Sequence, residues 1–270
     1  MARALVIVPT YNERENIVRL ISAILEQTPH LDVLVVDDNS PDGTGQLADA
    51  MAASSSRVTV LHRAGKLGLG TAYIAGFRHA LAGSYDYAIE MDADFSHRPD
   101  DLPRLLSMAQ EADLVIGSRN VPGGRAVDWS LLRTIISKGG SLYARLLLRL
   151  PIRDCTSGFK CFRSTVLAAL DLTEVRSNGY AFQVELNHLV HRAGFRIAEI
   201  PIIFEDRRIG SSKMSGAIVL EAAAMVWRLR GAQPGRAATA VPSPEAAPLA
   251  QAVSSPLLPI VSGKRLGGED

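Results

Sequence analysis

The feature that most constrains this fold is an alternation of short apolar runs with segments of helical periodicity, extending from residue 3 to residue 205. It predicts an α/β fold with a mixed, mostly parallel sheet and helices on both faces. Ligands in such sheets bind beyond the carboxyl ends of the strands. The expected strands are Ala4–Pro9, Val33–Asp37, Val58–Leu61, Tyr87–Met91, Leu114–Gly117 and Arg196–Phe204, and the expected helices are 14–27, 43–53, 70–82, 101–110, 131–149 and 180–193.

Composition divides the chain near residue 230. Residues 1–230 are predicted to form one domain, because an apolar content of 47% is enough for one sizeable core. Residues 231–270 hold 6 of the 14 prolines and lack periodicity, which predicts a disordered tail. The net charge of +1 gives no reason to expect a nucleic-acid partner.

No apolar stretch is long enough to predict a membrane-spanning helix, because charged residues interrupt each candidate. The opening residues, MARALVIVPTYNE, lack the features of a secretory signal, so a cytoplasmic location is expected. Cys155 and Cys161 have no neighbouring histidines, and we expect both to be free thiols.

The most informative motif is Asp92-Ala93-Asp94, at the end of an apolar strand. Two carboxylates spaced in this way can bind one hard divalent cation that also holds a diphosphate. An isolated Asp-x-Asp also begins many solvated loops, since exposed acidic residues are common.

Two other strand ends carry polar residues, VPTYNE at residues 8–13 and VVDDNSPDGT at residues 35–44. In a doubly wound fold they form one edge of a nucleotide pocket, and the second also has the composition of a turn that caps a helix. No Gly-x-Gly-x-x-Gly follows the first strand, and Gly65–Gly70 is not a Walker A sequence. A dinucleotide oxidoreductase or a P-loop NTPase is therefore not expected.

Seven segments occur in a characteristic order: VPTYNE, VVDDNSPDGT, GKLGLGTAY, MDADFSH, GSR, DCTSGFKCF and RRIGSSKM. Together they resemble the dolichyl-phosphate mannose synthase (polyprenol monophosphomannose synthase) group of family 2 glycosyltransferases, which has the Rossmann-like GT-A fold. The resemblance covers roughly residues 4 to 220.

The resemblance implies a role for each matching position. A divalent metal, Mg²⁺ or Mn²⁺, is expected at Asp92 and Asp94, with Ser96 as a weaker third ligand. Arg207 and Lys213 match a loop that closes over the donor phosphates, although an exposed basic turn also explains them. Arg119, Arg133 and Ser137 match the positions that hold the acceptor phosphate, although surface arginines are common on amphipathic helices. The implied nucleotide-sugar residues are Pro9, Tyr11, Glu13, Val36, Asp38, Asp92, Ala93, Arg207 and Lys213, and the implied catalytic residues are Asp94, Arg119, Arg133 and Arg207.

The implied reaction is transfer of mannose from GDP-mannose to a polyprenyl phosphate, with inversion. A phosphate monoester is already ionised at neutral pH, so no general base is needed. The same residues suit transfer of glucose from UDP-glucose, and a non-catalytic scaffold protein with this fold is a further alternative.

The lipid acceptor implies contact with a membrane, expected as peripheral binding to the inner face. Residues Ala217–Arg230 combine apolar residues with Trp227, Arg228 and Arg230, as an interfacial helix does. A helix packed on the core requires the same apolar stripe. Either a separate membrane-anchoring protein or transient contact would bring the enzyme to its acceptor.

Overall fold

The computed structural model describes residues 2–175, 177, 179–206 and 216–231. All of them belong to the first of the two units into which the chain divides, residues 1–240. The predicted disordered tail, apart from residue 231, lies outside the described residues, so the predicted domain boundary stays a prediction.

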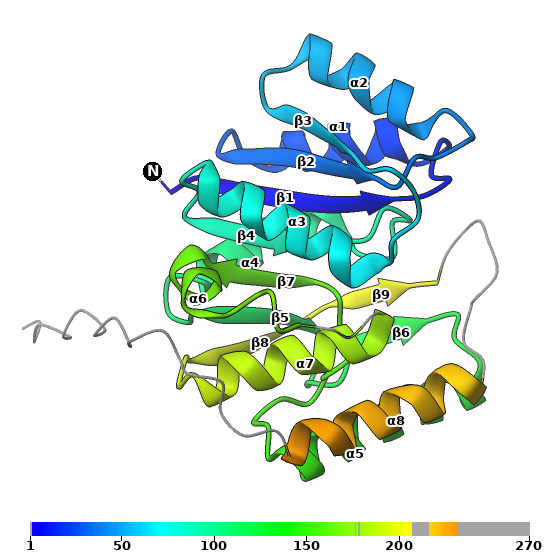
Figure 1. Ribbon diagram of the computed structural model, residues 1–270, viewed down its shortest axis with the longest axis vertical. Helices are drawn as coiled ribbons and strands as arrows, with labels where there is room; N and C mark the ends of the chain where they lie inside the picture. Colours follow the sequence, from blue (N-terminus) through cyan, green and yellow to red (C-terminus); the bar gives the residue numbers. More distant parts are fainter. Residues whose placement is uncertain (1, 176, 178, 207–215, 232–270) are drawn as a thin grey trace, which may run out of the picture. The chain divides into compact units, whose positions relative to one another are not determined.

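A seven-stranded sheet in the order β3-β2-β1-β4-β7-β5-β8 forms the centre of this unit (Figure 1). All neighbouring pairs are parallel except those that involve β7. The predicted mixed, mostly parallel sheet is therefore confirmed. Its strands are β1 (Ala4–Thr10), β2 (Leu31–Asp37), β3 (Val58–His62), β4 (Tyr87–Glu90), β5 (Leu114–Ser118), β7 (Lys160–Arg163) and β8 (Ile197–Pro201), and β6 (Arg125–Val127) pairs with β9 (Ile203–Glu205) in a second, two-stranded sheet.

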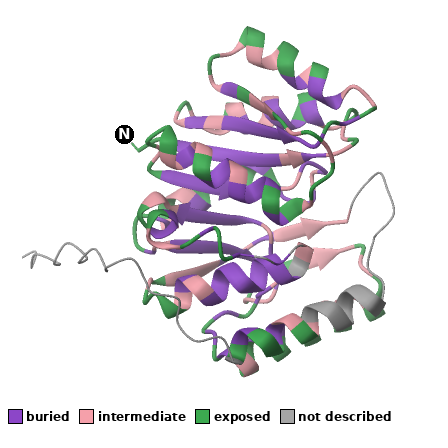
Figure 2. Cartoon of the chain, viewed as in Figure 1, coloured by how far each residue is buried: buried purple, intermediate pink, exposed green. Residues whose placement is uncertain are grey.

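Helices cover both faces of the large sheet, because strand side chains alternate between two apolar cores. Leu5 and Ile7 of β1 face one core, and Val6 and Val8 face the other. Figure 2 shows the strands buried between the two helical layers. The first layer is α3 (Leu69–Ala82), α6 (Ser164–Ala169) and α7 (Gly179–Arg192), extended by α5 (Leu131–Leu148) and α8 (Gly216–Gly231); the second is α1 (Ile17–Gln27), α2 (Thr44–Ser54) and α4 (Leu102–Met108), which follows the short 3₁₀ helix η1 (Pro99–Asp101).

Two parts of the sheet differ from the sequence prediction. The single strand expected over Arg196–Phe204 is wrong: β8 ends at Pro201, and the chain continues as β9 in the smaller sheet. The break follows from Pro201, which has no backbone N–H to continue the ladder. The second difference is β7, which was not predicted because its charged ends, Lys160 and Arg163, disguise a short buried strand.

The C-terminal helix α8 packs on α5 and α7. Val226 and Leu229 of α8 are buried in the first core, and the Tyr143 hydroxyl of α5 donates to the Ala223 carbonyl at 3.3 Å. No helix in the described part of the chain has both the length and the apolar character needed to cross a membrane. Cys155 and Cys161 are buried free thiols, as predicted.

A buried charged pair lies where β7 meets β4. Glu90 and Lys160 are opposite each other in the register of the two strands, and both are fully buried. Burial raises the pKa of Glu90 to about 7, which the Lys160 ammonium opposes. Burial likewise lowers the pKa of Lys160 to about 8, which the Glu90 carboxylate opposes. Each group therefore reduces the cost of burying the other.

We predict that Lys160→Met lowers the free energy of unfolding by about 3 kcal/mol, since it leaves the Glu90 carboxyl buried without its cation. The double variant Glu90→Gln/Lys160→Met removes both charges and should recover at least half of that loss. Urea unfolding followed by circular dichroism measures both values. A double variant no more stable than Lys160→Met would contradict the pairing.

Candidate active site

A pocket of about 370 Å³ opens at the carboxyl ends of β1, β4 and β5. Nine of the residues implied by the sequence line it together: Pro9, Tyr11, Glu13, Asp92, Ala93, Asp94, Ser96, Arg119 and Arg133. The remaining lining residues had no role assigned from the sequence: Lys66, Leu69, His97, Trp129, Thr156, Gly158, Gly179, Gln183 and Phe204.

The acidic loop after β4 is held by its own polar side chains. Asp94 Oδ1 accepts hydrogen bonds from the Ser96 backbone at 3.1 Å and from the Ser96 hydroxyl. The Asp92 backbone N–H donates to Nδ1 of His97 at 3.1 Å, and the Tyr73 hydroxyl donates to Asp92 Oδ1 at 3.3 Å. Phe95 has a left-handed φ of 62°, which is rare for a bulky residue and indicates a loop held in one conformation.

His97 is neutral and accepts a hydrogen bond within this loop. Its Nδ1 accepts the Asp92 N–H, so the proton of the neutral ring is on Nε2. Burial lowers the pKa of His97 to about 4, although the carboxylate of Asp94 opposes the shift. The ring stacks on Phe159 with a centroid distance of 4.9 Å, which fixes its orientation.

The two aspartates fit a divalent metal that shares its coordination with a substrate. Within the described residues no group of three or more His, Cys, Asp or Glu side chains could hold a metal alone. Mg²⁺ sites that bind nucleotides commonly use one or two carboxylates, with substrate phosphates and water as the other ligands. Asp92 and Asp94 match that donor set, whereas the Ser96 hydroxyl is engaged with Asp94 and its role as a ligand stays a prediction.

Arg119 is fixed by a two-pronged ion pair. Its Nε and Nη2 donate to the two oxygens of Asp154 at 2.7 and 2.6 Å, and its backbone N–H adds a third bond at 2.9 Å. Nη2 also donates to the Thr156 hydroxyl at 3.0 Å. The Arg119 guanidinium and these hydrogen bonds hold the pKa of Asp154 below its usual value, against the effect of burial. The arginine therefore presents one guanidinium orientation to the pocket.

Arg133 reaches the same pocket from the first turn of α5. The Ser130 hydroxyl caps this helix by accepting the Arg133 N–H at 3.3 Å. Arg133 Nη1 pairs with Asp206 at 2.6 Å, and its guanidinium lies 4.4 Å from the centre of the Trp129 ring. The Arg119 guanidinium lies 5.1 Å from the same ring, so one tryptophan contacts both arginines.

The side of the pocket next to β1 carries groups that suit a nucleotide. The Lys66 ammonium lies 4.1 Å from the centre of the Tyr11 ring. Buried Asp37 joins the ends of β1 and β2, accepting from the hydroxyls of Thr10 at 3.0 Å and Ser40 at 2.6 Å. The next residue, Asp38, forms an ion pair with Arg63 at 2.9 Å.

Some implied site residues are not among those that line the pocket. The side chain of Val36 is fully buried in the core, so only its backbone could face a nucleotide. Asp38 is engaged by Arg63 and the Leu67 N–H, and Ser137 is half-buried on α5 beyond Arg133. Arg207 and Lys213 lie outside the described residues. The roles of all five stay predictions.

Several pocket residues gave no usable signal in the sequence. Gln183 lies in a helical pattern that resembles any packed helix, and Trp129 and Phe204 resemble ordinary apolar residues. Thr156 and Gly158 were part of a recognised motif, DCTSGFKCF, but only the antiparallel direction of β7 explains their arrival at the pocket.

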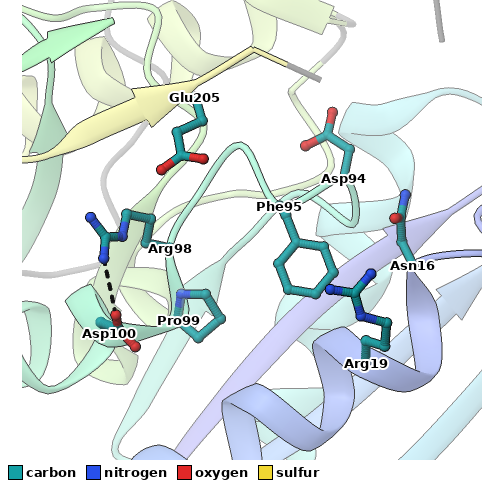
Figure 3. Close-up of a pocket in the computed structure, with 8 residues that line it drawn as sticks. All are labelled: Asn16, Arg19, Asp94, Phe95, Arg98, Pro99, Asp100 and Glu205. Carbon is teal, nitrogen blue, oxygen red and sulfur yellow. Dashed lines mark hydrogen bonds and ion pairs between the residues drawn. The ribbon is translucent and has the colours of Figure 1, made fainter. Parts of the chain in front are cut away.

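A second cavity of about 350 Å³ also borders the acidic loop, where Asp94 and Phe95 line it (Figure 3). Phe95 projects into it, with the Arg19 guanidinium 5.5 Å from the centre of the ring. Asp94 lines both cavities. The lining mixes Arg19 and Arg98 with acidic side chains and favours no ligand charge.

Solved structures share the architecture of this chain. The chain matches glucosyl-3-phosphoglycerate synthase from Mycobacterium tuberculosis in complex with Mn²⁺, UDP and glucosyl-3-phosphoglycerate, with a TM-score of 0.63 and 20% identity over 86% of this chain and 81% of that one. A second complex of that enzyme, with Mn²⁺, UDP-glucose and phosphoglyceric acid, gives a TM-score of 0.62 at 21% identity over the same shares. The likeness establishes the fold, and the expected GT-A fold is confirmed.

Relatives with higher identity cover most of the chain. An undecaprenyl-phosphate mannosyltransferase of Micrococcus luteus is 52% identical over 226 residues, which is 84% of this chain and 93% of that protein. A polyprenol monophosphomannose synthase of Mycolicibacterium smegmatis is 48% identical over 233 residues, which is 85% of this chain and 88% of that protein. The family model described as glycosyl transferase family 2 matches residues 5–170. By both comparisons, the chain belongs to glycosyl transferase family 2.

Proposed function

We propose that this enzyme transfers mannose from GDP-mannose to the phosphate of a polyprenyl phosphate, with inversion at the anomeric carbon. The products are GDP and polyprenyl phosphate β-mannose. The observation that carries the proposal is one pocket that holds both an acidic loop and two fixed arginines. The names of the two relatives, which are about half identical to this chain, support mannose and a polyprenyl acceptor.

The pocket has separate places for the two anionic substrates. The nucleotide suits the side of Tyr11 and Lys66, where a base or ribose meets an aromatic ring and a cation. The acceptor phosphate suits the arginine side, since guanidinium groups bind phosphate oxygens with directed hydrogen bonds. The acidic loop lies between them, where the diphosphate joins the sugar.

The chain's own residues supply position and charge rather than a base. An oxygen of the ionised acceptor phosphate forms the new bond to the anomeric carbon as the bond to the diphosphate oxygen breaks. No proton leaves the acceptor, because the second pKa of a phosphate monoester is about 6. Arg119 and Arg133 orient the attacking phosphate, which is itself the nucleophile, so a single displacement needs no nucleophilic side chain. A divalent cation on Asp92 and Asp94 would neutralise the charge of the departing diphosphate.

The donor and the stereochemistry are tested by one assay. With labelled GDP-mannose, polyprenyl phosphate and a divalent metal, we expect an organic-soluble, acid-labile product whose NMR spectrum has a β anomeric signal. UDP-glucose should give at least tenfold less product. A retained α configuration would exclude the single displacement, and higher turnover of UDP-glucose would identify a glucosyltransferase. No turnover of either donor would favour a scaffold protein.

Metal dependence is tested at the acidic loop. Asp92→Asn and Asp94→Asn should each lower kcat at least a hundredfold, because the charge that binds the cation is lost. Asn at 94 retains an oxygen that can accept the Ser96 hydrogen bonds, so the loop should persist. EDTA should abolish wild-type activity and Mn²⁺ or Mg²⁺ should restore it. Asp100→Asn, which removes an exposed acid nearby, is the control and should keep wild-type activity.

We further propose that one face of α5, with Trp227 of α8, contacts the membrane that holds the acceptor. Leu131, Leu132 and Leu146 are 77%, 68% and 69% exposed, which is unusual for leucine. This face begins beside Arg133, so a lipid head in the pocket would have its tail beside an apolar surface. The inner membrane face suits it, because its anionic lipids attract exposed basic residues: Lys138, Arg145, Arg149, Arg228 and Arg230. For residues 217–230 the sequence left open an interfacial helix or a helix packed on the core; Val226 and Leu229 are buried in the core, whereas Trp227 is 60% exposed.

The membrane contact is tested with Leu132→Glu/Leu146→Glu. Each leucine contributes about 1.5–3 kcal/mol when fully buried, so the double variant should bind anionic liposomes at least tenfold more weakly. Co-sedimentation measures this loss, and kcat with a short, water-soluble polyprenyl phosphate should stay unchanged. Val18→Glu, at an exposed apolar residue of α1, is the matched control. Equal binding by the double variant and the control would refute the assignment of this face.

A further inference from the structure

The floor of the pocket holds a polar group that the roles described above do not use. Gln183 of α7 lines the pocket but is only 3% exposed. Neither atom of its amide has a hydrogen-bond partner among the described residues. A buried amide left unpaired is costly, and most such groups in proteins have a partner. The arrangement therefore points to a ligand that supplies the missing bonds.

Gly158 shows what kind of group the floor accepts. A Cβ atom built on Gly158 would lie 3.5 Å from Gln183 Nε2, 3.8 Å from His97 Cε1 and 4.0 Å from Asp92 Oδ1. Three side chains thus surround a space the size of a methyl group, which a glycine leaves open. The Gln183 amide can donate a hydrogen bond into this space, and the Asp92 carboxylate can accept one. A hydroxyl group is of this size, and it both accepts and donates.

β7 fixes the backbone of Gln183, while its side-chain amide can still rotate. The Lys160 ammonium donates to the Gln183 backbone carbonyl at 3.0 Å, which ties the first turn of α7 to β7. The Gln183 amide lies near Glu90 and opposes the rise that burial causes in the pKa of that carboxyl, but the two side chains do not meet the geometric criteria of a hydrogen bond. The last torsion of a glutamine is soft, so the amide can turn toward the pocket without moving the helix.

We propose that Gly158, Gln183 and Asp92 form a subsite for one hydroxyl group of the transferred sugar, with Gln183 as the residue that recognises it. The inference rests on the proposed function, since the donor brings a polyhydroxylated ring beside the acidic loop. The nucleotide lies toward Tyr11 and the acceptor phosphate toward Arg119. The floor beside Asp92 is therefore left for the sugar.

The first test fills the space. Gly158 does not have a left-handed φ, and the new methyl group would make ordinary van der Waals contacts, so Gly158→Ala should fold normally. We expect kcat/KM for GDP-mannose to fall at least tenfold, while the affinity for GDP, measured by calorimetry, stays within twofold. A wild-type kcat/KM in this variant would overturn the subsite.

The second test removes the amide at nearly constant volume. Gln183→Leu should lower kcat/KM for GDP-mannose about tenfold, the effect of one good hydrogen bond. The same constants are measured with GDP-mannose analogues that each lack one sugar hydroxyl. The analogue missing the recognised hydroxyl should be poor for the wild type but equal to GDP-mannose for Gln183→Leu. If all analogues lose the same factor in both proteins, Gln183 does not contact the sugar.

The control is Asn187→Ala, one turn further along α7. It removes a buried hydrogen bond from the Asn187 amide to the Cys155 carbonyl at 3.0 Å, away from the pocket lining. It should lower stability without changing the ratios between donors. Wild-type turnover of GDP-mannose is measured first: its absence contradicts the proposed function, whereas normal turnover with unaffected variants contradicts the subsite alone.

Discussion

The antiparallel direction of β7 is the constraint on which this pocket depends. In an all-parallel sheet only segments that follow strands reach the carboxyl edge. Lys160, the first residue of β7, lies opposite the last residue of β4 and beside Ile116 of β5. The segment that precedes β7 therefore reaches the same edge, and it brings Asp154, Thr156 and Gly158. The antiparallel strand buries the Lys160 ammonium, and the Glu90 carboxyl at the opposite register position offsets part of the free-energy cost of that burial.

Asp154 links this topology to the electrostatics of the site. It accepts three hydrogen bonds from Arg119, and its own backbone N–H donates to Glu199 of β8 at 2.9 Å. Arg119 follows β5 and Asp154 precedes β7, so their ion pair joins two segments at the pocket edge. An arginine held in this way does not reorganise when a phosphate arrives, which is the condition for electrostatic preorganisation. The same contacts that stabilise the edge of the sheet would therefore also prepare Arg119 for the proposed acceptor phosphate.

The sequence predicted the parts of the site that follow predictable strands. Asp92 and Asp94 follow β4 and Arg119 follows β5, and apolar periodicity located both strands. It did not predict β7, because a four-residue strand with a buried charge at one end has no apolar alternation. The ion pair of Arg119 with Asp154 and the position of Gln183 depend on that strand, so they could not be predicted either. Val36 was assigned to the pocket by its motif, yet its side chain points into the core, because alternate strand residues face opposite sides.

The balance of charge explains why the described walls alone would bind anions poorly. Three acidic and three basic side chains line the pocket, and the carboxylates of Asp154 and Asp206 pair with two of the bases. The walls with their ion-pair partners are therefore acidic, while a nucleoside diphosphate and a lipid phosphate each add negative charge. At the short distances of such a site, Coulomb repulsion between like charges amounts to several kcal/mol. A divalent cation on Asp92 and Asp94 would offset the charge of these two carboxylates, and the predicted loop with Arg207 and Lys213 would add positive charge. On the proposed function, the lipid phosphate would therefore bind best once the donor and its cation are in place at the acidic loop.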